Sequence, residues 1–141
     1  MVFPAVTAAT AEVMCHNDWG PPNAVFHEGR PVGIIDFDTL KPGMRMWDLG
    51  YSAMSWLDLG DASYTGQEQI RRLKVFLEGY GRQDYSVPRL ATFCLARQSA
   101  LSAAGKARGN TELSEWALAT SRWTIEHVVE PLLPTGMMPA K

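Results

Sequence analysis

Polar residues suited to phosphate or metal chemistry gather in the first third of the sequence. His16, Asp18 and Asn23 lie in the stretch HNDWGPPN, whose glycine and two prolines predict an irregular loop. Asp36 and Asp38 follow at the end of an apolar segment. Burial of a lone carboxylate there is costly, so we expect a cation or several hydrogen-bond donors beside it.

Four of these side chains, Asp18, Asn23, Asp36 and Asp38, offer carboxylate or amide oxygens. Such ligands, with gaps left for water, suit Mg²⁺ that bridges phosphate groups better than they suit zinc. A His-x-Asp pair alone is more often a local turn bonded to its own backbone than a catalytic site. The surrounding elements must therefore decide between the two interpretations.

The chain before residue 40 reads as short extended segments at residues 13–15, 24–27 and 31–35. Glu28-Gly29-Arg30 predicts a hairpin turn between the last two, with glycine where a positive φ is needed. Pro42-Gly43 predicts a further turn, which leaves Lys41 in solvent.

The pattern after residue 43 is helical. Apolar residues on nearly every side of residues 47–57 are typical of a buried helix. Further helices are expected from the capping box at Thr65 to Gly81, from Ser86 towards Gly105, and from Asn110 to a stop before Pro131. We expect one domain over residues 1–141, with a loose tail near 134–141. Four tryptophans are expected to anchor the core: Trp47, Trp56, Trp116 and Trp123.

The motifs of this region are, in chain order, H-x-D-x-x-x-x-N, the hairpin, I-D-F-D and P-G-x-x-x-W-D-L. The order of these motifs resembles the C-terminal catalytic lobe of the aminoglycoside phosphotransferase and choline kinase-like family of small-molecule kinases. Order and spacing agree over about residues 13–80. The resemblance implies an α+β fold, a small hairpin and strand layer against a mainly helical lobe. Met44, where many relatives carry Asp, and the loop filling at residues 19–22 depart from the pattern but remove no catalytic group.

The resemblance implies a role for each matching residue. Asp18 would be the catalytic carboxylate, which accepts the proton of the substrate hydroxyl or orients that hydroxyl, and His16 would brace the loop. Asn23 and Asp36 would hold Mg²⁺ on the phosphates of ATP. For Asp38, a second metal-side role and a plain position at a strand end remain equally open.

The resemblance also implies a structural role for Asp48, which would accept hydrogen bonds from the backbone of the catalytic loop. Kinases of this family have an N-terminal lobe with a lysine that contacts ATP, whereas only a dozen or so residues precede Cys15 here. We therefore expect a catalytic lobe without its ATP-holding partner, and Lys41 is no credible substitute. Uncovered apolar surface near the loop would favour self-association.

The expected chemistry is transfer of the ATP γ-phosphate to a hydroxyl of a small molecule, with Mg²⁺ as cofactor. The alternative is a non-catalytic kinase-like module or truncated pseudoenzyme that binds a small ligand or a partner chain. A metal hydrolase built on Asp18, Asp36 and Asp38 has the least support, because no water-activating histidine accompanies them. The acceptor is not identified. Two interpretations stay open for three acidic residues, attraction of a cation such as an aminoglycoside or plain solvation, namely for Asp58, Asp61 and Glu68.

Composition excludes several other classes. With 13 basic and 15 acidic residues among 141, the net charge of −2 gives no basic field for nucleic acid. No apolar run reaches the roughly 20 residues that cross a bilayer, and the N-terminus does not resemble a signal peptide, so we expect a cytoplasmic protein without a membrane partner. Cys15 and Cys94 are then expected to be reduced core thiols.

Overall fold

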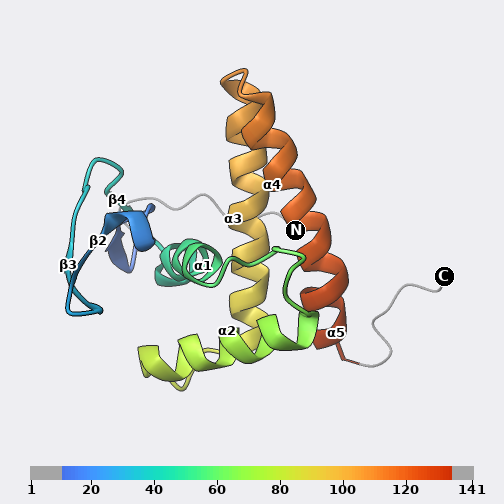
Figure 1. Ribbon diagram of the computed structural model, residues 1–141, viewed down its shortest axis with the longest axis horizontal. Helices are drawn as coiled ribbons and strands as arrows, with labels where there is room; N and C mark the ends of the chain where they lie inside the picture. The colour runs from blue at the N-terminus through green and yellow to red at the C-terminus, as the bar shows by residue number, and fades with distance from the viewer. Residues whose placement is uncertain (1–10, 135–141) are drawn as a thin grey trace.

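The computed structural model describes residues 11–134 and shows an α+β chain in which short strands precede helices (Figure 1). The expected loose tail lies outside the described residues, except for Pro134. In chain order the elements are β1 (Val13–Cys15), η1 (Pro21–Asn23), β2 (Ala24–His27), β3 (Arg30–Ile34), β4 (Lys41–Gly43), α1 (Arg45–Trp56), α2 (Gly66–Tyr80), α3 (Val87–Ala107), α4 (Thr111–Thr124), η2 (Ile125–Val129) and α5 (Glu130–Leu132).

The strands form two antiparallel pairs, β1 with β4 and β2 with β3. The predicted hairpin is confirmed, and its turn places Glu28 and Gly29 at positive φ values of 49° and 74°. The turn predicted at Pro42-Gly43 is wrong, because these residues belong to β4, where Pro42 lies opposite Met14. Proline is accepted in this two-stranded sheet because an edge strand has one side without ladder hydrogen bonds.

The helices build the core. α3 packs against both α1 and α4, and α2 lies across one end of α3 (Figure 1). Gly50 lets α1 approach α3 closely, since a Cβ there would lie 2.8 Å from the backbone carbon and oxygen of Phe93. The largest fully buried apolar side chains are Met46, Leu73, Leu90, Val128, Cys15 and Cys94, and both cysteines are free thiols.

The helix boundaries follow their capping residues. The Thr65 hydroxyl accepts a hydrogen bond from the Glu68 N–H at 3.1 Å, and Gly81 ends α2 at a φ of 83°. The stop predicted before Pro131 is wrong, because the last helical run passes through a π-helical turn, η2, and continues to Leu132. Proline has no N–H and its ring collides with the carbonyl four residues earlier, and the wider turn before it accommodates both effects.

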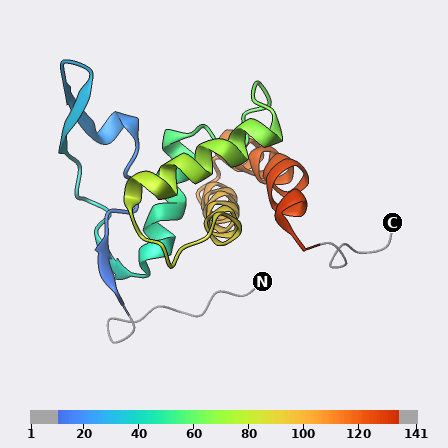
Figure 2. The ribbon, with the colours of Figure 1, turned by 90° about the horizontal axis from the view of Figure 1, so that it is seen from below.

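Burial differs from expectation for one of the tryptophans. Trp116 is 52% exposed and is no core anchor, whereas Trp47 and Trp123 pack against the core. Large apolar side chains are exposed along the strands and the segment after them, namely Met14, Val25, Phe26, Val32, Ile34, Ile35, Phe37 and Leu40. The β2–β3 hairpin projects away from α3 and α4 (Figure 2). No helix within residues 11–134 has the length and apolar character to cross a membrane.

Candidate active site

The loop after β1 is tied to the end of the hairpin by His16. This buried imidazole donates from Nε2 to the carbonyl of Ile35 at 2.9 Å, and its Nδ1 accepts the backbone N–H of Asp18 at 3.2 Å. One donating and one accepting nitrogen describe a neutral ring with its proton on Nε2. His16 therefore connects two segments that are distant in sequence and also fixes the backbone N–H of Asp18.

The carboxylate of Asp18 is oriented from two sides. Its Oδ1 accepts a 2.6 Å hydrogen bond from the Tyr51 hydroxyl, and its Oδ2 accepts one from Asn23 Nδ2 at 3.0 Å. The same Asn23 amide also donates to the Asp18 carbonyl at 2.8 Å. Burial, with the Asp18 contact second, raises the pKa of Tyr51 to about 12, so the phenol keeps its proton and remains a donor at neutral pH.

Asp48 lies at the start of α1 and is half-buried beneath the loop. Its Oδ2 accepts the backbone N–H of His16 at 2.9 Å, and its Oδ1 accepts that of Asn17 at 2.8 Å. Thr39 donates its hydroxyl to the His16 carbonyl at 2.6 Å. Backbone groups of an irregular loop thus receive partners that no regular element could give them.

Sequence reasoning missed Arg97, which lies on α3 and contacts the same loop. Its Nη1 donates to Asn17 Oδ1 and its Nη2 to the Asn17 carbonyl, both at 3.0 Å. The guanidinium also lies over the rings of Trp47 and Tyr51, 4.5 and 5.0 Å from their centroids. Helical spacing from Leu90 and Phe93 would have placed position 97 on the buried face, and an arginine there was the available signal.

Two of the expected metal ligands lie at neighbouring positions. The carbonyl of Asn23 accepts the backbone N–H of Ile35 at 3.0 Å, which sets Asn23 beside the residue that precedes Asp36. Asp36 has a φ of 60° and is exposed, so the expectation of a buried carboxylate in need of compensation is wrong. Asp38 is also exposed and lies in the turn that follows, with its N–H 3.4 Å from Asp36 Oδ1.

The oxygen chemistry of these residues fits Mg²⁺. No three His, Cys, Asp or Glu side chains within residues 11–134 are arranged to hold a metal by themselves. Magnesium in proteins is commonly held by one or two carboxylates, substrate phosphates and waters, and needs no larger cluster. Asn23 and Asp36 therefore provide suitable ligand types for a magnesium ion that also binds phosphate.

A cleft of about 770 Å³ opens beside Asp18, between the loop with β4 on one side and α1 with α3 on the other. This volume is in the range of small-molecule sites. The lining side chains include Asp18, Asp38, Lys41, Trp47, Arg97 and Leu101.

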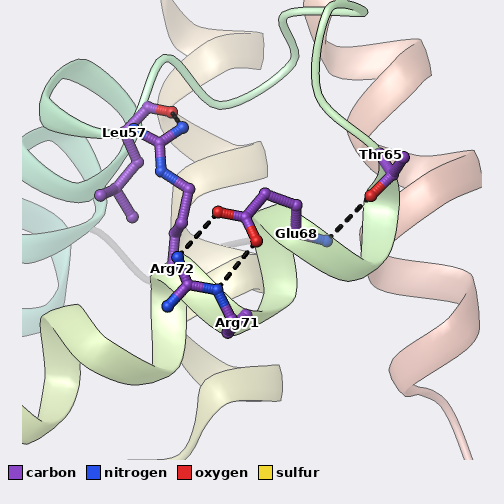
Figure 3. A network of polar contacts seen from close by, with 5 residues as sticks. All are labelled: Leu57, Thr65, Glu68, Arg71 and Arg72. Carbon is purple, nitrogen blue, oxygen red and sulfur yellow. Dashed lines mark hydrogen bonds and ion pairs between the residues drawn. The ribbon is translucent and has the colours of Figure 1, made fainter.

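The acidic residues considered for cation binding lie elsewhere. Neither Asp58, Asp61 nor Glu68 lines the cleft. Glu68 pairs with Arg71 at 2.8 Å on α2, and Asp61 accepts the Ser63 N–H (Figure 3 shows the Glu68 contacts). Arg72 is half-buried on α2 and donates to the Leu57 carbonyl at 2.7 Å (Figure 3). Of these contacts, the Arg72 bond ties α2 to the end of α1, and all of them are separate from the cleft.

Comparison with known proteins places this loop in a family. Residues 3–91 match the model of the phosphotransferase enzyme family. The chain is 28% identical over 134 residues to the trifolitoxin immunity protein of Rhizobium leguminosarum bv. trifolii, a match that covers 82% of this chain and 51% of that protein. The chain thus spans about half the length of this curated relative. No solved structure matches the chain. Because the family match includes the whole loop and more than half of the sequence, the chain belongs to the phosphotransferase enzyme family.

Proposed function

We propose that this chain is the kinase-like catalytic lobe of a small-molecule phosphotransferase, which transfers the γ-phosphate of ATP to a hydroxyl group. The observation that carries the proposal is the Asp18 carboxylate, held by Tyr51 and Asn23 at the edge of an open cleft. A carboxylate fixed in this way suits a group that must meet a hydroxyl in one orientation. Family membership supports the same chemistry.

In the proposed reaction the acceptor hydroxyl enters the cleft and donates its hydrogen bond to Asp18. Its oxygen forms a bond to the γ-phosphorus while the bond from that phosphorus to the β–γ bridging oxygen breaks, so ADP leaves with those electrons. Asp18 takes the hydroxyl proton and later releases it to solvent. Tyr51 and Asn23 keep the carboxylate aimed at the acceptor throughout.

Asn23 and Asp36 are the residues proposed to hold Mg²⁺. Asp38, whose N–H lies near the Asp36 carboxylate, is the one of the three that lines the cleft. When bound, the ion would neutralise charge on the phosphates of ATP. The carbonyl of Asn23 fixes the end of β3, which keeps the asparagine and Asp36 at adjacent positions. The amide of Asn23 already donates to Asp18, so the two proposed parts of the site share one residue.

Asn23 and Asp36, the residues proposed to hold the metal on ATP, do not line the cleft beside Asp18. The relative is about twice as long as the matched region, and the exposed apolar side chains of β2, β3 and residues 35–37 offer a face for further chain. We therefore propose that full activity requires an N-terminal lobe at this face. Activity is to be measured on the chain alone and on its fusion with the half of the relative that the match does not cover.

The decisive experiment follows ³²P from γ-labelled ATP into a panel of hydroxyl acceptors. Asp18→Asn should lower turnover by at least ~100-fold, a common contribution of a general base. Asp61→Asn, an exposed carboxylate outside the cleft, is the matched control and should leave turnover unchanged. Full turnover in Asp18→Asn would remove that residue from the mechanism.

A calorimetric titration tests the metal site without turnover. With few protein ligands, Mg²⁺ or Mn²⁺ should bind with a dissociation constant on the order of millimolar. Asp36→Asn should abolish the binding, and Asp61→Asn should retain it. Equal binding by Asp36→Asn and the parent would exclude Asp36 as a ligand, and metal binding without turnover in either form would favour the non-catalytic alternative.

A further inference from the structure

We propose that Arg97 is a positioning residue of the site, which holds Asn17 in place and thereby sets the direction of the neighbouring Asp18. The inference rests on the proposed function for the role of Asp18. Arg97 lies beyond residues 3–91, the part of the chain that matches the family. The site would thus be completed by a helix segment that the family match does not cover.

Asn17 occupies a backbone conformation that needs support. Its φ is 66°, in the left-handed region that residues with a side chain seldom adopt. Two bonds from Arg97 reach its Oδ1 and carbonyl, Asp48 accepts its N–H, and its Nδ2 donates to the Thr39 carbonyl at 2.9 Å. Because Asn17 directly precedes Asp18, its backbone angles fix where the Asp18 side chain begins.

A second route connects the same arginine to the carboxylate. The guanidinium lies 5.0 Å from the ring centre of Tyr51, and the hydroxyl of Tyr51 donates to Asp18 Oδ1 at 2.6 Å. Arg97 therefore contacts both the residue before Asp18 and the residue that bonds its side chain. Both neighbours would move if the guanidinium were lost.

The surroundings explain why an arginine is suited to this position. Arg97 is only 8% exposed; burial lowers the pKa of its guanidinium, and the nearby carboxylate of Asp48 opposes that shift in part. Two donors in one rigid plane serve the two oxygens of Asn17 together, while its flat face covers the ring of Trp47. Lysine keeps the charge but has one nitrogen, so it cannot reproduce this arrangement.

Arg97→Lys and Arg97→Gln test the proposal, with Arg89→Gln as control. Arg89 lies on the same helix but is exposed and contacts Tyr85. The first measurement is hydrogen exchange by NMR, which needs no turnover. Exchange of the His16 and Asn17 amides should accelerate at least tenfold in both Arg97 variants, with helix α3 amides such as that of Cys94 unchanged.

The second measurement is phosphate transfer by the form that is active. Misdirection of Asp18 should lower kcat tenfold or more and leave KM for the acceptor within twofold, whereas loss of folded protein alone would not change the kcat of the remaining folded fraction. Arg89→Gln should match the parent in both measurements. If Arg97→Gln does not fold, Arg97→Lys carries the test.

Three outcomes separate the proposals. Unchanged loop exchange in the Arg97 variants overturns the positioning role, whatever the turnover. Equal acceleration of loop and α3 amides also overturns it, because Arg97 would then act only on global stability. A parent without turnover in either form defeats the proposed function, and the exchange data still decide whether Arg97 orders the loop.

Discussion

The strand region, residues 13–43, and the helical region, residues 45–132, use their apolar residues in opposite ways. In the helical region Leu73, Leu90 and Val128 are fully buried, whereas in the strand region Val32 is 63% and Phe37 53% exposed. A helical region with its own core can fold around itself. The strand region has little core of its own and takes its order from contacts with the helices.

The proposed chemistry divides along the same line. Asp18 and Asn23 belong to the strand region, and Asp48, Tyr51 and Arg97, which hold their loop, belong to the helical region. In the proposed function, the helical region with its buried core holds the loop in place. The more exposed strand region carries the proposed reacting groups. Changes in each region should therefore have different consequences.

The largest difference is expected for the same substitution in the two regions. Leu73→Ala removes a side chain with no exposed surface and should lower the free energy of unfolding by about 2 to 5 kcal/mol. Leu40→Ala removes one that is 40% exposed and should cost well under ~1 kcal/mol. Urea unfolding of both variants measures the difference, and equal losses would show that the strand region has a core of its own.

The next effect concerns the carboxylate that joins the regions. Asp48→Ala leaves the His16 and Asn17 N–H groups without their acceptor and should destabilise the protein by about 2 kcal/mol, which lowers Tm by roughly 4 to 8 °C.

Asp18→Asn is the matched comparison for Asp48→Ala. Asparagine keeps one oxygen for the Tyr51 hydroxyl, and the Asn23 amide, which loses its side-chain acceptor, still donates to the carbonyl of residue 18. It should melt within about 1 °C of the parent. Thermal melts followed by circular dichroism give both values. An Asp48→Ala variant that melts like the parent would contradict the division into a helical region that holds the loop and a strand region that carries the reacting groups.

A smaller effect is expected from the exposed face of the strand region. Apolar patches of this kind favour association, so the parent should self-associate at tens of micromolar, as an order-of-magnitude expectation. Val32→Ser combined with Phe37→Ser should weaken association about tenfold, whereas Lys106→Ser on α3 should not. Sedimentation velocity measures this, and a clean monomer for the parent would show that the face is stable in water.

Local signals predict the hairpin and the starts of three helices. Gly29 supplies the turn, and the side chains of Thr65, Ser86 and Asn110 cap three helices as their spacing predicts. These features depend on residues a few positions apart, so they are readable without the fold. The candidate site residues of the loop can be recognised for the same reason, because one short stretch of sequence contains them.

Features that depend on distant pairing were missed. The turn predicted at Pro42-Gly43 fails because this pair resembles a local reversal, while the strand partner of β4, β1, lies about 30 residues earlier. Tyr51 and Arg97 were recognisable as inward-facing helix positions, but their polar partners lie 33 and 80 residues away. Trp116 was misjudged because periodicity gives the faces of a helix and not which face the core will cover.

The smallest expected effect tests whether water reaches the hydrogen bond between Tyr51 and Asp18. Burial raises the Tyr51 pKa from 10.0 to about 12, so between these values the unfolded chain loses the tyrosine proton and the folded chain keeps it. The stabilisation is thus fully present below pH 10 and is lost as the pH rises towards 12. Tyr51→Phe cannot show this loss, so the stability advantage of the parent over the variant should shrink from pH 9 to pH 11.

Burial also raises the pKa of the Cys94 thiol, but in both proteins, and this contribution cancels in the difference. Urea unfolding across this range gives the curve, and a constant difference would show that water reaches the Tyr51 hydroxyl and that the two regions meet there through a solvated contact.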